Sequence, residues 1–408
     1  MSNTEPAPLE QVCVNGPYTL DELPEPSGLR DGVTSTQGGV KLLEPRDVPL
    51  GGPRAMNVRR TLPQRARSLV GAWCFLDFYG PDDVTEAKPM RVPRHPHTGL
   101  ATCSWLFSGR IDHLDSAGNW ATVRPGEVVM MNAGYGISHS EYSTTDTKIL
   151  HGAQLWYAFP EEHRFVEPSL ENHRPEPVRG EGWEAKVFLG DLLGYRSPVK
   201  TYIPLTGAEL RIEPGQSVDI EVPSDHEHAL LRIRGAVSLN GSEVPADHLA
   251  VVDPGAKMLR VSAHDEPVLA LLIGGEPLGE QIVMWWNFVG RSHEEIAAYR
   301  AAYQAEMGFE VPGPDSPLAS KLGHGAGEAP LYGNKQTETA ARPDGSQHDV
   351  DVEDGALGEP IRGELRDALA QSTYDDGRPF PQFGDFPPGQ HPPLPAPALP
   401  TTRMKPRG

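Results

Sequence analysis

The sequence predicts an all-β protein made of two tandem β-barrel units, followed by a short helix and a disordered tail. Short apolar segments separated by Gly, Pro and Asp turns recur between residues 54 and 159 with almost no helical periodicity, which is typical of a β-barrel or sandwich. A second series between residues 187 and 286 repeats the turn chemistry of the first and indicates a duplicated unit. One strong helical signal, at residues 292–308, follows the second series.

The expected strands of the first unit end at recognisable turn signals. In Arg124-Pro125-Gly126-Glu127, Pro precedes Gly, which favours a type II turn. Polar and small residues at positions 115–119 form another turn. The strands expected in this unit cover residues 54–63, 70–79, 100–107, 110–114, 120–123, 128–131 and 151–159.

The second unit follows the same pattern and ends in the helix. Glu213-Pro214-Gly215 repeats the Pro-Gly turn of the first unit. Ser292 as N-cap and Glu295 three residues later form a capping box, apolar residues recur at helical spacing up to Met307, and Gly308 can end the helix. The strands expected in this unit cover residues 187–190, 202–203, 208–212, 229–233, 248–252, 267–273 and 281–286.

These signals divide the chain into four parts. Residues 1–36 are expected to be a flexible leader, residues 37–170 the first unit, and residues 171–310 the second. Pro, Gly, Asp and Glu dominate residues 311–408, which cannot bury enough surface to offset their chain entropy and are expected to form a disordered tail. Within the tail, residues 360–372 could form a short amphipathic helix, either transient or used for docking.

Charge and cysteine content exclude several classes of function. The formal net charge of −20 repels phosphate backbones, so we expect no direct binding of nucleic acid. Cys74 and Cys103 fit buried strands, Cys13 falls in the leader, and their spacing indicates neither a disulfide framework nor a thiolate metal site. The first 21 residues lack a secretory signal and no apolar run reaches membrane-spanning length, so a cytoplasmic protein without a membrane partner is expected.

Two pairs of candidate metal ligands stand about forty residues apart. His95 and His97 form one pair, and His139 and Glu141 form the other. Side chains at positions i and i+2 of a strand project from the same face, so each pair can point into one barrel interior. Three imidazoles and one carboxylate favour iron, nickel, copper, manganese or zinc. A redox ion held by four protein ligands keeps a position open, whereas a closed tetrahedral zinc would be structural.

The second unit contains another His-x-His pair, His226 and His228. No second His or Glu pair follows at the matching place, and two ligands make a poor metal site. These two residues are therefore expected to be solvated loop histidines, and the second unit is expected to lack a complete metal site.

At this point the motifs resemble a known family. His95-Pro96-His97-Thr98-Gly99 and the segment at residues 133–141, AGYGISHSE, resemble the two metal motifs of pirins, which are bicupin proteins. The segment HGAQLW at residues 151–156 resembles the pirin stretch HGLQLW. Residues 275–278, 287–289 and 294–296 resemble the C-terminal signature of the family, and the resemblance covers about residues 37 to 310.

The resemblance implies two cupin barrels, with Fe²⁺ in the first held by His95, His97, His139 and Glu141. It also implies two alternative functions. Some pirins are similar in activity to quercetin 2,3-dioxygenase, whereas others act as iron-dependent transcriptional co-regulators or bind metabolic enzymes. The partners expected are thus a phenolic or flavonol substrate with O2, or a protein.

Three positions depart from the family pattern. Arg94 stands where many pirins have Asp, Leu100-Ala101-Thr102 replaces a Phe-Glu-Thr pattern, and Trp286-Asn287 replaces Gly-Pro. Ala101 in place of Glu removes a carboxylate that could hydrogen-bond to a metal ligand and so adjust the reactivity of the metal.

We expect a metal-dependent dioxygenase of the quercetinase type, in which Glu141 takes the proton of a flavonol hydroxyl. Trp105, Phe107 and Met131 are candidate pocket walls, by strand parity with His97 and proximity to the ligand strand. The main alternative is an iron-responsive binding module without turnover, and a structural bicupin is a third.

Overall fold

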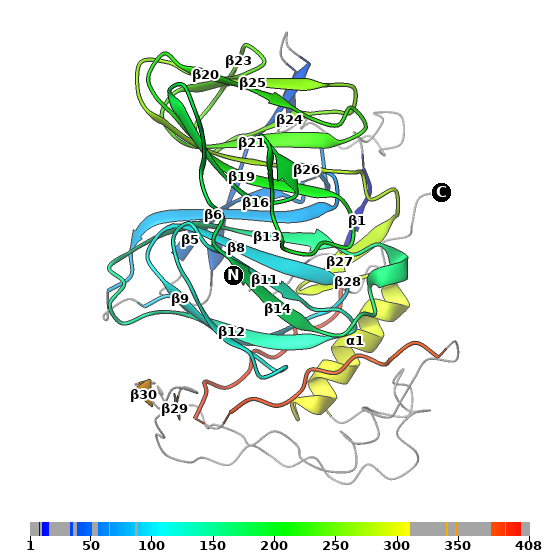
Figure 1. Ribbon diagram of the computed structural model, residues 1–408. Coiled ribbons are helices and arrows are strands. Elements are labelled where there is room, and N and C mark those ends of the chain that lie inside the picture. The colour runs from blue at the N-terminus through cyan, green and yellow to red at the C-terminus, as the bar shows by residue number, and fades with distance from the viewer. Residues whose placement is uncertain are drawn as a thin grey trace.

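The computed structural model describes residues 8, 10–15, 33–35, 39–50, 56–64, 66–85, 89–310, 340–341, 347–348, 377–387 and 389–400. Two β-units lie one above the other, and helix α1 (His293–Glu306) flanks the first, lower unit (Figure 1). Each unit combines one large sheet with a four-stranded sheet. The predicted all-β class with two barrels and a short C-terminal helix is confirmed.

The first unit is built from a seven-stranded and a four-stranded antiparallel sheet. The large sheet has the order β14-β11-β8-β13-β6-β5-β4, and the small sheet has the order β10-β9-β12-β7. Their strands are β4 (Arg46–Leu50), β5 (Met56–Leu62), β6 (Trp73–Asp83), β7 (Arg91–His97), β8 (Leu100–Ser108), β9 (Ile111–Asp115), β10 (Trp120–Val123), β11 (Val128–Asn132), β12 (Ile137–Ser143), β13 (Ile149–Ala158) and β14 (Ser169–His173).

The second unit repeats this plan with an eight-stranded and a four-stranded sheet. The orders are β15-β16-β19-β26-β21-β24-β3-β2 and β20-β25-β22-β23, with β17 and β18 as a separate hairpin. The strands are β2 (Val33–Ser35), β3 (Val40–Leu43), β15 (Val178–Gly180), β16 (Trp183–Leu189), β17 (Asp191–Leu192), β18 (Tyr195–Arg196), β19 (Leu205–Ile212), β20 (Ser217–Glu221), β21 (Glu227–Arg234), β22 (Val237–Leu239), β23 (Ser242–Val244), β24 (Leu249–Val252), β25 (Met258–Ala263) and β26 (Val268–Gly275). Strand β3 precedes the first unit in sequence but pairs with β24, which the expected division at residue 37 did not anticipate.

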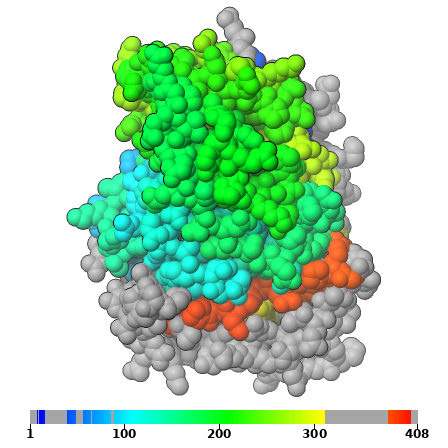
Figure 2. Space-filling view, viewed as in Figure 1, coloured from blue at the N-terminus to red at the C-terminus, as the bar shows by residue number. Residues whose placement is uncertain are grey.

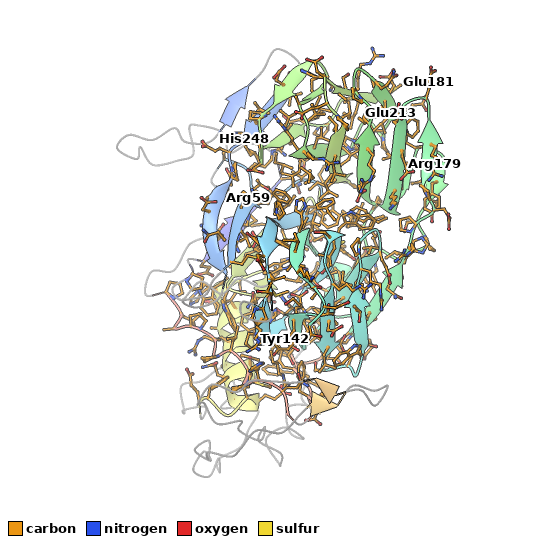
Figure 3. All side chains as sticks on the ribbon, turned by 90° about the vertical axis from the view of Figure 1, so that its left-hand side faces the viewer. Arg59, Tyr142, Arg179, Glu181, Glu213 and His248 are labelled. Atoms are coloured by element: carbon orange, nitrogen blue, oxygen red, sulfur yellow. The ribbon has the colours of Figure 1, made fainter. Side chains whose placement is uncertain are left out.

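Side chains fill the interiors of both units (Figure 3). In this view the label Tyr142 identifies the first unit and the label Glu213 the second. The two units share one apolar core that runs across their contact. Trp105 of β8 stacks on Phe188 of β16 with ring centroids 4.4 Å apart, and its Nε1 donates to Glu209 Oε2 at 2.9 Å. The contact between the units is therefore buried, aromatic and hydrogen-bonded.

The helix is capped as its sequence predicts. Ser292 Oγ accepts a hydrogen bond from Glu295 N at 3.2 Å, so the N-cap prediction is confirmed. The helix packs against β27 (Ile282–Trp285) and β28 (Phe288–Gly290), which form a three-stranded sheet with β1 (Gln11–Cys13). No helix among the described residues is long and apolar enough to cross a membrane.

Two described segments differ from the expected flexible leader and tail. Strand β1 pairs with β27, and Cys13 is fully buried, so the leader prediction is wrong at these residues. Residues 377–387 and 389–400, here called the C-terminal strap, run along α1 and beneath β12 (Figure 1). On the surface they form an orange-red band below the first unit (Figure 2). The strap buries Phe380 and Phe383 almost completely. The helix expected at residues 360–372 lies outside the described residues, and the tail also contributes the two-residue strands β29 (Ala340–Ala341) and β30 (Gln347–His348).

Candidate metal centre

Strands β7 and β12 bring three of the predicted ligands together. The strands are antiparallel, with His139 opposite His95 and Ile137 opposite His97. The ring centroids lie 4.3 Å apart for His95 and His139, 5.0 Å for His97 and His139, and 5.1 Å for His95 and His97. All three side chains are buried, because the alternation of each strand directs them into the barrel.

The outer ring nitrogens of the first two histidines are held by backbone carbonyls. His95 Nδ1 lies 2.8 Å from Pro93 O, and His97 Nδ1 lies 3.1 Å from Asn287 O. Each Nδ1 therefore carries the proton and donates, which leaves Nε2 with its lone pair. None of the Nε2 atoms of His95, His97 and His139 has a hydrogen-bond partner among the described residues, although all three are buried.

These unpartnered nitrogens fit a metal ion. One possible ligand atom from each of His95, His97 and His139 lies within 4.8 Å of the others. A buried polar atom without a partner is costly, and a first-row metal ion is the natural acceptor of three converging imidazole lone pairs. Carbonyls bound to the outer nitrogens are the usual means by which proteins orient metal-binding imidazoles.

Burial keeps the three imidazoles neutral. Burial lowers the pKa of His95 to about 4. It also holds the pKa of His97 well below the ordinary value, with His95 adding to the effect, and the same applies to His139 beside His95 and His113. Neutral imidazole is the form that binds a metal, so the centre is ready to bind without first losing protons.

Glu141, the fourth predicted ligand, lies in the same interior but in a second group. One ligand atom from each of Glu141, His139 and His113 lies within 4.8 Å of the others, and all three residues are buried. The register between β12 and β7 shifts by one residue between these two ligands: His139 pairs with His95, whereas Glu141 pairs with Val92. His139 thus belongs to both groups and connects Glu141 with His95 and His97.

Two residues of this centre were not predicted from the sequence. His113 of β9 lies opposite Glu141, and its Nδ1 is 3.3 Å from His139 Nδ1. A strand was expected at residues 110–114, so parity along it could have identified His113 as facing inward. Asn287 follows Trp286, whose positive φ of 53° turns the chain so that the Asn287 carbonyl reaches His97.

The expected pocket walls are only partly found near the centre. Trp105 faces the second unit, where it contacts Phe188 and Glu209, so its assignment to the pocket is wrong. Phe107 packs near His151, with ring centroids 5.0 Å apart. Met131 packs with Ile137 of the ligand strand β12.

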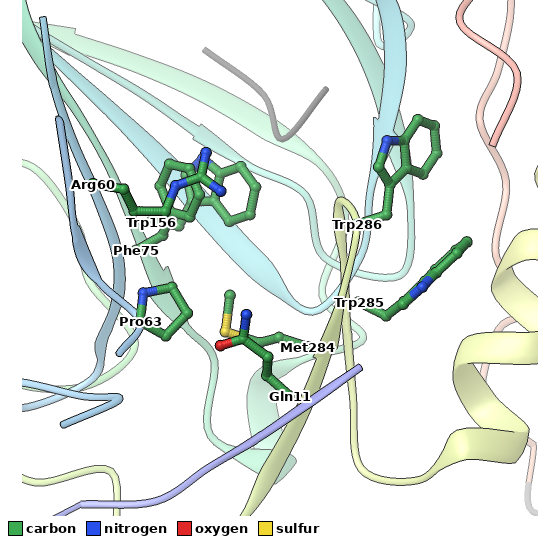
Figure 4. Close-up of a pocket in the computed structure, with 8 residues that line it drawn as sticks. All are labelled: Gln11, Arg60, Pro63, Phe75, Trp156, Met284, Trp285 and Trp286. Atoms are coloured by element: carbon green, nitrogen blue, oxygen red, sulfur yellow. The ribbon is translucent and has the colours of Figure 1, made fainter. Parts of the chain in front are cut away.

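Trp156 of β13 is a wall that the sequence did not reveal. Its ring meets the ring of His97 edge to face at 4.9 Å and stacks on Phe75 at 3.9 Å. It also lines a small pocket of about 20 Å³ with Gln11, Arg60, Pro63, Phe75, Met284, Trp285 and Trp286 (Figure 4). This pocket has room for about one water molecule, so a flavonol could enter there only if the lining side chains moved aside.

The second unit holds a different arrangement. His228 lies in β21 and is fully buried, so the expectation of a solvated loop histidine is wrong for this residue. Its ring is 6.2 Å from that of His226. The described residues place no third His, Cys, Asp or Glu with this pair at metal-binding distance.

Two cupin barrels in tandem, with a buried histidine cluster in the first, define a bicupin with a candidate metal site. The sequence matches the family described as Pirin over residues 55–157, and its partner, the Pirin C-terminal cupin domain, over residues 207–309. The chain belongs to the pirin family.

Individual relatives agree with this assignment. A Pseudomonas aeruginosa protein named "Putative quercetin 2,3-dioxygenase" is 37% identical over 260 residues, which cover 64% of this chain and 82% of that protein. A pirin-like protein of Caulobacter vibrioides is 35% identical over 259 residues, covering 61% and 88%. The crystal structure of quercetin 2,3-dioxygenase from Acinetobacter baumannii superposes with a TM-score of 0.63 at 31% identity, covering 73% of this chain and 97% of that chain.

Proposed function

We propose that this protein is a metal-dependent dioxygenase that opens the central ring of a flavonol such as quercetin, with Fe²⁺ held by His95, His97, His139 and Glu141. The observation that carries this proposal is the set of three buried, unpartnered Nε2 atoms beside a buried carboxylate. The likeness to a solved quercetin 2,3-dioxygenase at 31% identity supports the substrate class.

A bound ferrous ion would supply a Lewis-acidic position for a flavonol hydroxyl and a redox centre for O2. The ring then opens with uptake of O2 and loss of carbon monoxide, so no external reductant is required. The residues of the chain position the substrate and move its proton.

Glu141 is proposed to accept the proton of the flavonol hydroxyl. Its carboxylate lies in the buried group with His139 and His113, away from bulk water. In such surroundings a proton transferred from the substrate stays close to the reacting oxygen. Trp156 and Phe75 would exclude water beside His97 and offer flat apolar surfaces to an aromatic substrate.

Aerobic turnover of quercetin by the full chain, loaded separately with Fe²⁺, Ni²⁺ or Cu²⁺, tests the proposal. We expect quercetin loss with release of carbon monoxide, a fall of at least about 100-fold in kcat for Glu141→Gln, and loss of bound metal for His139→Ala. His264→Ala is the matched control, because this half-buried histidine lies in the second unit.

Two outcomes would count against the proposal. Wild-type turnover by Glu141→Gln would remove the proton role from this residue. Absence of turnover with every metal, together with metal-dependent capture of a protein partner, would favour the regulatory alternative.

A further inference from the structure

We propose that His113 is a positioning residue that fixes the tautomer and orientation of His139 through a His139–His113–Asp115 relay. His113 is 2% exposed and sits between the other two side chains. Its Nδ1 is 3.3 Å from His139 Nδ1, and its Nε2, which makes no hydrogen bond among the described residues, lies at ion-pair distance, 3.5 Å, from Asp115 Oδ2. The inference rests on the proposed function only in requiring that His139 is a metal ligand.

Proton positions follow from the two ends of the relay. Asp115 is held in place by hydrogen bonds that its Oδ1 accepts from Ala117 N at 2.9 Å and Asn119 N at 3.0 Å. A fixed carboxylate favours a proton on His113 Nε2, which leaves His113 Nδ1 as the acceptor for His139 Nδ1–H. His139 Nε2 then keeps its lone pair for the metal, as Pro93 O and Asn287 O ensure for His95 and His97.

This geometry places His113 behind His139 and not beside the ion. The two nitrogens of an imidazole point in different directions, and His113 meets the Nδ1 side of His139, whereas the unpartnered Nε2 faces His95 and His97. For His139, the relay takes the place of the backbone carbonyl that accepts the Nδ1 proton of each of the other two histidines. A histidine relay ending on a carboxylate also raises the basicity of the ligand nitrogen, and loss of such a partner typically weakens metal binding about 10- to 100-fold.

Metal affinity of the full chain, measured with Co²⁺ by chelator competition and by the visible spectrum of bound Co²⁺, tests this role. His113→Leu removes the acceptor, and we expect affinity to fall about 10- to 100-fold with an altered spectrum and one Co²⁺ still bound at saturation. His113→Asn keeps a side-chain carbonyl and should recover most of the lost affinity. Asp115→Asn should weaken binding as well, because an amide can present a donor to His113 Nε2.

His139→Ala and His264→Leu are the reference variants. Equal affinities of His113→Leu and His113→Asn, or wild-type affinity in both, would overturn the relay. Loss of all bound Co²⁺ in His113→Leu, as in His139→Ala, would instead make His113 a ligand. If His139→Ala binds Co²⁺ normally, the proposed ligand set itself fails.

A second inference comes from the C-terminal strap. We infer that the strap clamps the outer face of the ligand strands and slows the exchange of metal. Phe383 O accepts hydrogen bonds from Ser138 Oγ at 2.5 Å and from Arg94 Nη2 at 2.9 Å. Arg94 directly precedes His95, and Ser138 directly precedes His139, so one strap residue holds both ligand strands at the positions next to their histidines.

The strap is anchored on the other side by the helix. Phe383 packs edge to face on Tyr303 at 5.2 Å, and Phe383 N donates to Glu306 Oε2 at 2.8 Å. Leu394 N donates to Arg94 O at 2.7 Å, and Tyr303 OH donates to Leu394 O at 2.8 Å. Arg94, which departs from the Asp of many pirins, therefore joins β7 to the strap through both its side chain and its backbone.

Gly136 shows how close the strap lies to the ligand loop. A Cβ built on Gly136 would lie 2.6 Å from Gln382 O, so a larger residue there would push the strap away. Separation of β7 from β12 would open the edge at which His95 faces His139. The docked strap resists this separation, and release of metal should require the strap to move first.

The rate at which a strong chelator removes Co²⁺ from the full chain tests the clamp. We expect Phe383→Ala and Arg94→Ala each to release metal on the order of tenfold faster than wild type. The double variant should release metal little faster than either single variant, because Phe383→Ala removes the packing and Arg94→Ala a hydrogen bond of the same strap segment, and either change undocks it. Phe309→Ala is the matched control, since Phe309 packs on the same aromatic cluster from outside the strap.

The inference would be overturned if Phe383→Ala released Co²⁺ at the wild-type rate. It would also be overturned if Phe309→Ala released Co²⁺ as fast as Phe383→Ala. Should Phe383→Ala fail to fold, Arg94→Ala and hydrogen exchange of the β12 amides decide the question. A wild-type exchange rate in Arg94→Ala would then contradict the inference. The ligand set is tested separately by His139→Ala, whose failure to affect metal binding would not bear on the docking of the strap.

Discussion

His228 is a buried histidine outside the candidate metal centre. It is fully buried in β21, and neither of its ring nitrogens has a hydrogen-bond partner among the described residues. Burial lowers its pKa to about 4, well below the ordinary value for histidine. The folded state therefore binds its proton less readily than the unfolded state does, and the neutral side chain stabilises the fold above about pH 6.5.

This pKa shift predicts a loss of stability in acid. As the pH falls from 6.5 to 4, the unfolded state gains a proton that the folded state does not, which costs about 3 kcal/mol. His228→Leu should remove this contribution, so the urea midpoint of the variant should fall less between pH 7 and pH 4 than that of wild type. His264→Leu, at a half-buried position, should keep the wild-type slope, and equal slopes in all three proteins would contradict the assignment.

At the same scale, the sequence could reveal the candidate ligands but not what surrounds them. Period-two spacing placed His95 with His97 and His139 with Glu141 on common faces, and the structure brings the three histidines together. His113 has Asp115 at i+2, but Asp115 was assigned to the turn at residues 115–119, so His113 was visible only as part of a strand. Which residue supports a ligand from behind depends on the pairing of β9 with β12, and a single sequence does not contain that pairing.

At the scale of elements, the tight turn between β27 and β28 supports the metal centre under strain. Trp286 adopts a positive φ of 53°, a region in which a side chain costs about 1–2 kcal/mol. The same residue is 5% exposed and packs on Phe288 and Tyr303. Its burial is worth about 3–5 kcal/mol, so packing outweighs strain.

The balance between packing and strain predicts that two substitutions at this position destabilise the protein by different amounts. Trp286→Gly should destabilise the protein by about 2–3 kcal/mol, because the lost packing exceeds the relieved strain. Trp286→Ala loses the same ring without gaining backbone freedom, and should be about 1 kcal/mol less stable than Trp286→Gly. Urea unfolding at neutral pH measures both, and a Gly variant no more stable than the Ala variant would show that the turn is unstrained.

Strand periodicity predicted most elements but failed at three places for physical reasons. Trp105 was assigned to the pocket by counting alternate residues from His97. Gly99 turns the chain between β7 and β8, which lie in different sheets, so the alternation of β7 does not continue into β8. Strand β1 and the C-terminal strap lack the length and alternation that mark a strand. Strand β1 is ordered by pairing with β27, hundreds of positions away, and the strap by packing on α1, where Phe383 and Glu306 are 77 positions apart.

At the scale of the whole molecule, a buried ion pair connects the two units. Arg67 Nη1 of the first unit donates to Glu227 Oε1 of the second at 2.9 Å, and both side chains are 2% exposed. Glu227 Oε2 also accepts from Gly71 N at 2.7 Å and Asn15 Nδ2 at 2.9 Å. One carboxylate thus satisfies three donors from the other side of the contact.

Removal of this carboxylate should weaken the coupling between the units. Glu227→Leu leaves the Gly71 amide without this acceptor and Arg67 with Asp253 as its remaining acidic partner, and should destabilise the protein by about 1–3 kcal/mol. Glu227→Gln retains an acceptor and should cost less, whereas Asp219→Leu breaks an exposed ion pair with Arg260 within one unit and should cost under about 1 kcal/mol. Calorimetry should show one transition for wild type and two for Glu227→Leu, since each unit has its own sheets and an apolar cluster of its own besides the shared core. A Glu227→Leu protein that unfolds at the temperature of the Asp219→Leu control would show that the shared apolar core alone holds the two barrels together.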